Sequence, residues 1–486
     1  MTLSSFLVGL VPGRAAQRPV AQRMDLRAAL WKAISLLGLM VFAVLLGASI
    51  PFLPWFLYLG AAALVLYPLL VFKAPWVAFT LYAVGTFVAP GFKSADALTL
   101  FTLILFSLRW VHVGRPAVLP AFLAKPYLML LAAVAVAVLV GGAKRHPVPM
   151  IYMDGRGFLY WLWLPLLYSL VQSASDGVKR CARAFALIAA VIAFIALVQY
   201  VTGVQVVAAG RVGDLDAGNA GQTRVQMHGF LFIAVATVWA LVAAVHSPRR
   251  IPWLVPFLLL MLAALYANFG RALWFWTAVA VMFSVYLSGR QRGGALALIL
   301  VVGGVFASGG LLLAKPKVVD SIVDRVVSVR EEGGARTSYG WRKLENQDAL
   351  PHILRNPVTG LGLGAEYRRW MHEVATFEQH TRYVHNSYLF IALKTGVPCL
   401  VAILVLLLSA WRRGWYGTRR LDVPQRAARI AALASLFPLL GLSITQPELV
   451  TPMSVLLFVL MTVLLGSCER PGESSAGSAA VPQPIN

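Results

Sequence analysis

The stretch HNSYLFIALKTGVPCLVAILVLLL, residues 385–408, opens with three polar side chains and continues as an almost wholly apolar run. About 20 helical residues cross the hydrocarbon core of a bilayer, so the run has the length of a membrane-spanning helix. His385 and Asn386 stand at its start, directly after a long hydrophilic segment at 315–384. An imidazole at the mouth of a membrane helix is well placed for chemistry at a membrane surface.

Apolar runs of this kind fill most of the chain. Hydrophobic residues make up 59% of the sequence and charged residues only 13%, a balance that soluble domains do not show. We therefore predict an all-α polytopic membrane protein with 12–14 transmembrane helices; the lower number applies if short neighbouring runs merge. The predicted spans are 29–50, 51–72, 75–92, 97–113, 127–142, 156–173, 183–203, 228–246, 252–268, 271–287, 295–314, 385–409, 426–446 and 450–467.

The formal net charge of +23 is concentrated in the short loops between the predicted spans. Every second loop is the basic one, which is the positive-inside pattern of membrane proteins and not the pattern of a nucleic-acid-binding surface. The pattern places both termini in the cytoplasm and excludes nucleic acid as a partner. The long loop holds 11 basic and 9 acidic residues and falls on the opposite side, which is the periplasm in a bacterial inner membrane.

These assignments divide the chain into five parts. Residues 1–28 form a cytoplasmic N-terminal segment, and residues 29–314 form a transmembrane helical domain. Residues 315–384 form a large, partly helical periplasmic loop before the last three spans, which occupy 385–467. Residues 468–486 are rich in Ser, Ala, Gly and Pro and are predicted to be a disordered cytoplasmic tail.

Polar and charged residues gather on the predicted periplasmic side. The residues of interest are Asp154, Arg156, Arg211, Arg224, His228, Arg271, Arg382, His385 and Asn386. A guanidinium offers a rigid fork of donors to phosphate, so the arginines are candidate anion ligands. The alternative for Arg271 is an interfacial arginine beside the aromatic residues 274–276, and Arg211 and Arg224 could be ordinary loop arginines. His385 is a candidate general base, or else a residue that only sits at the interface.

The long loop contains a predicted amphipathic helix at 339–350, with Trp341, Leu344, Ala349 and Leu350 on its apolar side. We expect this helix to lie along the membrane surface. The Gly-x-Gly-x-Gly run at 360–364 then predicts a bend in which backbone segments pack closely. It is not a nucleotide loop, because no strand precedes it and no lysine follows at the required spacing.

No metal site or cofactor is predicted. His372, Glu373 and His380 lie in the long loop without a His-Glu-x-x-His motif, and the three cysteines have no metal-ligand spacing. These loop residues are expected to be surface or substrate-contacting groups.

Two stretches resemble a known family. GWRKLENQDALPHILRNPVTGLGLGAEY, residues 340–367, followed after 17 residues by the run that begins at His385, is similar to the bacterial O-antigen ligase and polymerase superfamily. The resemblance is specific over about residues 339–409. Elsewhere it rests on the topology, on the long loop and on the periplasmic arginines. The superfamily's Ser-Arg-Gly at a helix start reads Gly270-Arg271-Ala272 here, which keeps the arginine.

The resemblance implies a GT-C-like fold and a metal-independent glycosyltransferase. Such an enzyme would move a glycan from undecaprenyl pyrophosphate to an acceptor hydroxyl at the periplasmic face. His385 corresponds to the catalytic histidine, and Arg271 to an arginine that holds the pyrophosphate. Arg224 falls in the region of another arginine of the family, Arg211 is a possible helper, and Arg382 and Asn386 are further candidate substrate contacts.

Three enzyme identities share this signature. They are an O-antigen ligase with lipid A-core as acceptor, which we favour slightly, a polymerase that extends a growing glycan, and an oligosaccharyltransferase that glycosylates protein hydroxyls. A polysaccharide transporter or flippase is the alternative from another class. Few ionisable residues lie in the middle of the predicted spans, where transport pathways usually have them, and this argues for an enzyme.

Overall fold

A computed structural model describes residues 65–89, 91–113, 119–174, 176–207, 210–214, 223–289, 338–370, 381–417 and 423–467. The chain forms two compact units, residues 1–74 and 75–486. In the first unit, residues 65–73 are helical. The predicted spans 29–50 and 295–314 lie outside the described residues, as do the segments 1–28 and 468–486.

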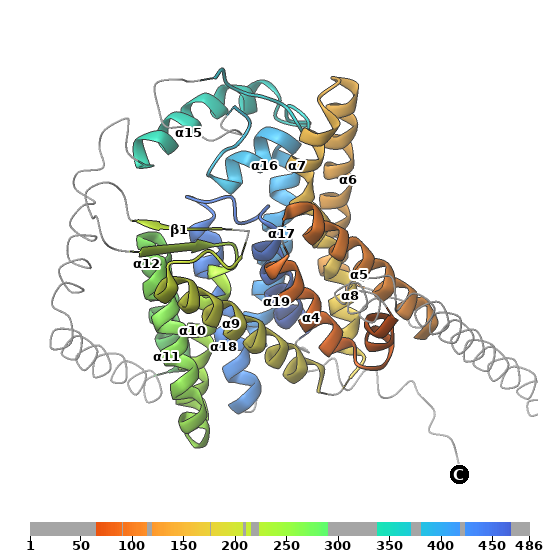
Figure 1. Ribbon diagram of the computed structural model, residues 1–486. Coiled ribbons are helices and arrows are strands. Elements are labelled where there is room, and N and C mark those ends of the chain that lie inside the picture. The colour runs from red at the N-terminus through yellow and green to blue at the C-terminus, as the bar shows by residue number, and fades with distance from the viewer. Residues whose placement is uncertain are drawn as a thin grey trace, which may run out of the picture. The chain divides into compact units, whose positions relative to one another are not determined.

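The described residues of the second unit are helical apart from one hairpin and the turns that link the elements (Figure 1). Its α-helices are α4 (Pro75–Val88), α5 (Phe92–Val113), α6 (Ala121–Ala143), α7 (Val148–Leu159), α8 (Trp163–Gln172), α9 (Gly177–Thr202), α10 (Phe230–His246), α11 (Ile251–Asn268), α12 (Arg271–Ser288), α15 (Ser338–Arg355), α16 (Ser387–Thr395), α17 (Val397–Gly417), α18 (Val423–Leu442) and α19 (Pro452–Gly466). Short 3-10 turns, η2 (Tyr160–Leu162) and η3 (Pro248–Arg250), link two pairs of them.

Six of the described helices are long and apolar enough to cross a membrane, namely α5, α6, α9, α11, α12 and α17. The apolar helices α4, α10 and α19 are shorter. The prediction of an all-α polytopic membrane protein is therefore confirmed.

The interior of the second unit is built around α19 and α10. Residues 453–466 of α19 are all buried, and the helix packs against α8, α17 and α18. A helix that is apolar on every side has no face to offer to water, so it belongs in the interior. Next to it, α10 packs on α12 and α18 through a cluster that includes Val238, Leu241, Ile430 and Ala434.

Two predicted spans are broken in the structure. The span predicted at 385–409 is two helices, α16 and α17, which are separated at Gly396. Gly396 has φ of 84°, a left-handed value that favours glycine, and a Cβ there would meet the carbonyl oxygen of Val358 at 2.0 Å. The backbone N–H of Val397 donates to the carbonyl of Pro357 at 2.8 Å, so the break is sealed by the upstream loop.

The span predicted at 156–173 is a succession of α7, η2 and α8, and α7 begins at Val148. The span was predicted to start only at residue 156 because the charged residues Asp154 and Arg156 were not expected inside a membrane helix. Both side chains are accommodated inside the helical unit because each has a partner of opposite charge, Lys394 for Asp154 and Asp96 for Arg156. Paired charges can be buried where isolated ones cannot.

An antiparallel hairpin occupies the loop that was predicted at about 204–227. Strand β1 (Gly210–Asp214) pairs with β2 (Thr223–Met227) in the register Gly210 with Met227 and Asp214 with Thr223. In Figure 1 the hairpin lies beside one end of α12. It is the only sheet among the residues that the structure describes.

The long loop contains the predicted helix, but its buried side differs from the prediction. Helix α15 buries Glu345, Ala349 and Ile353, which lie four residues apart on one stripe, whereas Leu350 is 50% exposed. The stripe packs on α16 through a cluster that includes Phe390 and Leu393. A carboxylate, not an apolar residue, therefore begins the buried face of this helix.

The glycine run forms the predicted close-packed bend. Gly362 has φ of 88°, and a Cβ there would meet the backbone nitrogen of Gly141 in α6 at 2.7 Å. The N–H groups of Leu361 and Gly362 donate to the carbonyls of Leu393 and Lys394 at the end of α16. The bend thereby joins the long loop to α6 and α16 at once.

Candidate active site

His385 lies immediately before α16, where the chain turns into the helix. Asn386 is the N-cap residue, and its side-chain oxygen accepts hydrogen bonds from the backbone N–H groups of Tyr388 and Leu389 at 3.0 and 3.2 Å. Ser387 ties the same turn to the loop between α18 and α19, because its hydroxyl donates to the carbonyl of Gln446 at 2.8 Å. The backbone that carries His385 is thus fixed on two sides.

The imidazole of His385 contacts Glu345 from α15. Its Nδ1 lies 2.9 Å from Glu345 Oε2 and 3.0 Å from Oε1, and the backbone N–H of His385 donates to Oε2 at 2.9 Å. The His385 side chain is 23% exposed, whereas that of Glu345 is completely buried. Tyr383 packs its ring edge-on against the imidazole, with 5.0 Å between ring centroids.

Arg368 supplies the charge that faces Glu345. Its Nη2 lies 3.4 Å from Glu345 Oε1, and its side chain is only 3% exposed. The guanidinium also stacks over the ring of Trp341, 4.3 Å from its centroid, a cation–π contact.

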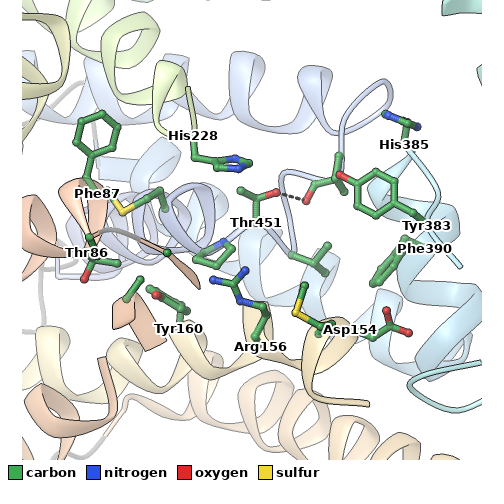
Figure 2. Close-up of a pocket in the computed structure, with 18 residues that line it drawn as sticks. Thr86, Phe87, Asp154, Arg156, Tyr160, His228, Tyr383, His385, Phe390 and Thr451 are labelled. Carbon is green, nitrogen blue, oxygen red and sulfur yellow. Dashed lines mark hydrogen bonds between the residues drawn. The ribbon is translucent and has the colours of Figure 1, made fainter. Parts of the chain in front are cut away.

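His385 lines a cavity of about 420 Å³ (Figure 2). His385, Tyr383 and Phe390 lie at one end of it, and Thr86 and Phe87 lie at the other. The wall combines aromatic rings with a few convergent polar groups, which is the usual make-up of a small-molecule site.

Arg156 and His228 point into the middle of this cavity from opposite walls (Figure 2). Arg156 belongs to α7, and its Nε and Nη2 donate to the two oxygens of Asp96 in α5 at 2.8 and 3.2 Å. Tyr152 and Tyr160 also donate to Asp96, so this carboxylate fixes the direction of the guanidinium. His228 follows β2 directly and precedes α10.

Burial changes the proton affinity of several groups near the cavity. The ring of His228 keeps accessible surface because it faces the cavity, but protein atoms surround it closely; this burial and the charge of Arg156 lower the pKa of His228. Burial raises the pKa of the Tyr383 phenol, and the nearby carboxyl groups of Glu448 and Glu345 raise it further. Burial also raises the pKa of Glu448 to about 7, against a hydrogen bond from Ser454 that lowers it.

The predicted arginines Arg224 and Arg271 lie near one another but do not line this cavity. Arg224 projects from β2, and its Nε donates to the carbonyl of Asn268 at 3.0 Å. Arg271 begins α12 three residues later, after Phe269, which has the unusual φ of 51° for an aromatic residue. The tight turn between α11 and α12 thus brings the two arginines to the same corner of the second unit.

The other predicted contacts are placed as follows. Arg382 is only 7% exposed, lies three residues before His385 and is absent from the cavity lining. The side chain of Arg211, in β1, lies outside the described residues, as do His372 and His380. Asn386 caps α16. Among the residues that the structure describes, no group of three or more His, Cys, Asp and Glu is arranged to hold a metal ion.

Comparison with known families gives a match over the segment that contains His385. Residues 256–404 match the model of a family described as O-antigen ligase. This match supports membership of the chain in the O-antigen ligase superfamily. No curated protein matches the chain.

The O-antigen ligase segment runs from α11 into α17, and so contains Arg271, Glu345 and His385. Arg156, Arg224 and His228 lie before it. At the general level, the O-antigen ligase match implies a role as a ligase or polymerase of lipid-linked glycans in a membrane.

Reasoning from the sequence missed three features of this site. Glu345 was given no role, although its spacing from Ala349 and Ile353 places it on their face of a helix. Arg156 and His228 were predicted on the same side as His385 but were not assigned to the site. Their association with His385 depends on the packing of α5, α7 and the loop before α10, which periodicity along the chain does not encode.

Proposed function

We propose that this O-antigen ligase superfamily member transfers a glycan from undecaprenyl pyrophosphate to an acceptor hydroxyl, with His385 as general base. One observation carries the proposal: the His385 imidazole is held at the wall of a cavity large enough for a sugar unit, and a second histidine and an arginine line the same cavity. The O-antigen ligase match over residues 256–404, which include His385, supports a glycan as the group transferred.

The chemistry is a single displacement. His385 takes the proton of the acceptor hydroxyl as the oxygen attacks the anomeric carbon of the donor glycan. The new carbon–oxygen bond forms while the bond from that carbon to the pyrophosphate oxygen breaks, and the pyrophosphate departs with the electron pair. Attack from the face opposite the leaving group predicts inversion at the anomeric carbon, and retention would contradict the mechanism.

Guanidinium groups are proposed to bind the leaving pyrophosphate. Arg271 and Arg224 lie at one corner of the unit, outside the cavity lining, and Arg211 and Arg382 are further candidates. Donors aimed at the departing oxygens stabilise the charge that develops on them, so the reaction requires no metal ion. Transfer should therefore persist in a chelator at a concentration that removes free divalent cations.

The cavity is proposed to open toward the periplasm, with both termini of the protein in the cytoplasm of a bacterial inner membrane. The turns that carry His385, Arg224, Arg271 and the glycine bend lie in loops that the positive-inside pattern assigns to one side. Reporter fusions after residues 207 and 289 test this, since they should report opposite sides of the membrane.

Reconstitution with labelled undecaprenyl-linked donor tests the function and separates its alternatives. Label in lipid A-core identifies a ligase, label in a longer lipid-linked glycan a polymerase, and label in protein an oligosaccharyltransferase. His385→Ala should abolish transfer, whereas His352→Ala, in the last turn of α15, should not. Transbilayer movement of donor that depends on the protein, without any labelled product, would instead indicate a flippase.

A further inference from the structure

The buried carboxylate of Glu345 contacts the His385 imidazole at Nδ1. We infer that Glu345 is a positioning residue that selects the tautomer of His385, so that Nε2 is the nitrogen that takes the acceptor proton. This inference rests on the proposed function of His385 as the base. It concerns which ring nitrogen of His385 is protonated, and so it can be wrong while the proposed function is right.

The geometry defines which ring nitrogen carries the proton. Both oxygens of Glu345 lie within 3.0 Å of His385 Nδ1, and Oε2 also accepts the backbone N–H of His385. An ionised carboxylate only accepts hydrogen bonds, so Nδ1 must carry a hydrogen. In a neutral imidazole the other nitrogen, Nε2, then holds the lone pair and is the basic atom.

Arg368 makes an ionised Glu345 compatible with complete burial. A buried carboxylate without a counter-charge would be strongly destabilising. Arg368 Nη2 lies 3.4 Å from Glu345 Oε1, and the stacking of its guanidinium on Trp341 holds it there. Glu345 from α15 thus contacts the ring nitrogen of His385, and Arg368 from the loop after the glycine bend contacts Glu345.

The path of the proton through the step can then be followed. The acceptor O–H bond breaks, an N–H bond forms at His385 Nε2, and the ring becomes an imidazolium that donates to Glu345 through Nδ1. Glu345 keeps its charge and stabilises that cation without taking the proton, as in the logic of a histidine oriented by a buried carboxylate. When the pyrophosphate has left, Nε2 loses the proton to solvent.

Glu345→Gln is the discriminating variant. A glutamine side chain has one acceptor, and the backbone N–H of His385 competes with the ring for it. If the backbone takes that acceptor, the amide N–H of the glutamine faces Nδ1, and the imidazole must carry its hydrogen on Nε2 instead. We expect kcat to fall by roughly 10²–10⁴-fold with KM for the donor little changed. Glu345→Asp, which keeps the carboxylate, should retain more activity than Glu345→Gln.

A spectroscopic measurement separates this role from a merely structural one. The 15N chemical shifts of labelled histidine, with His385 assigned by comparison with His385→Ala, report which ring nitrogen is protonated. The wild type should show hydrogen on Nδ1, and Glu345→Gln should show it on Nε2. Glu366→Gln is the matched control, because Glu366 accepts from Thr381 in the same loop region at 3.1 Å.

Loss of charge balance could unfold Glu345→Gln, so the double variant Glu345→Gln, Arg368→Gln is measured beside it. The double variant leaves no uncompensated charge, and it should fold but remain slow. Wild-type kcat or an Nδ1-protonated ring in either folded variant would overturn the inference. If His385→Ala also transfers glycan, His385 is not the base and the proposed function is wrong. If the Glu345 variants transfer glycan at the wild-type rate but His385→Ala does not, only the inference about Glu345 is wrong.

Discussion

Lys394 Nζ lies 2.7 Å from Asp154 Oδ2, which joins α16 to α7 beneath the glycine bend. Lys394 is completely buried, and its ammonium also donates to the carbonyl of Ala365. Asp154 in turn accepts the backbone N–H of Gly364 at 2.8 Å. One ion pair therefore fixes two helices and the loop that runs between them.

Lys394→Met should destabilise the protein strongly, because it leaves the carboxylate of Asp154 inside the unit without its partner. Removing one member of a buried pair costs about 3–5 kcal/mol. The thermal unfolding midpoint in detergent checks this, with Lys343→Met, an exposed lysine of α15, as the control. If Lys394→Met combined with Asp154→Asn is no more stable than Lys394→Met, the pair is not coupled.

Gly362→Ala should also lower stability, since its φ of 88° is left-handed and an added Cβ would meet backbone of α6. The strain of that conformation alone is on the order of 1 kcal/mol, and the steric conflict with backbone adds to it. Gly142→Ala is the matched control: a Cβ there meets nothing within 4 Å, and alanine is the better helix former. Equal unfolding midpoints for the two variants would contradict the close approach of the bend to α6.

Substitution of Glu448 should change how stability depends on pH. Its pKa is raised from an ordinary value of 4.5 to about 7, so the folded state favours the protonated carboxyl. The stability that this contributes is fully present below pH 4.5 and is lost as the pH rises through 7, by roughly 3 kcal/mol at most. Glu448→Gln stays neutral, and its unfolding midpoint should fall less than that of the wild type between pH 5 and pH 8. Parallel pH profiles would show that Glu448 is not the group responsible.

A bulky residue at Gly91 should block the cavity without unfolding the protein. Gly91 lines the cavity, and a Cβ there meets nothing within 4 Å. One methylene group in a pocket is worth roughly 10–200-fold in kcat/KM, and leucine adds four carbons, so we expect Gly91→Leu to reduce kcat/KM for glycan transfer by at least about 10-fold. Gly142→Leu, which is equally open but outside the cavity, should leave transfer unchanged. Normal kinetics in Gly91→Leu would place the substrate elsewhere.

The apolar runs of the sequence predicted the position of most described helices, because a membrane span must be long and apolar whatever it packs against. The bend at 360–364 was also predictable, since three alternate glycines favour a turn in which backbone segments pack closely. The break at Gly396 was not, because it depends on N–H groups of a loop about 35 residues upstream. Glu345 was missed for a similar reason. A carboxylate in a helix is expected to face solvent, and its burial is explained only by its partners His385 and Arg368.

The placement of Arg224 and Arg271 illustrates the limit of motif reasoning in another way. Each arginine was recognised by its own neighbourhood, and the hydrogen bond from Arg224 to Asn268 brings them to one corner. Arg156 entered the site through its pairing with Asp96, two helices earlier in the chain. A pattern along the sequence identifies chemical types, whereas the contacts between helices decide which of those types share a space.

The interruption between α16 and α17 has a consequence for how the protein is made. Helix α16 has only nine residues and cannot cross a bilayer, and its terminal carbonyls are capped by Leu361 and Gly362. The ribosome finishes that loop before it starts the short helix, so the capping amides already exist when α16 emerges. Biogenesis therefore follows the order of the polypeptide here, and a circular permutant that moved residues 338–370 to the C-terminus would leave α16 uncapped at the moment of its insertion.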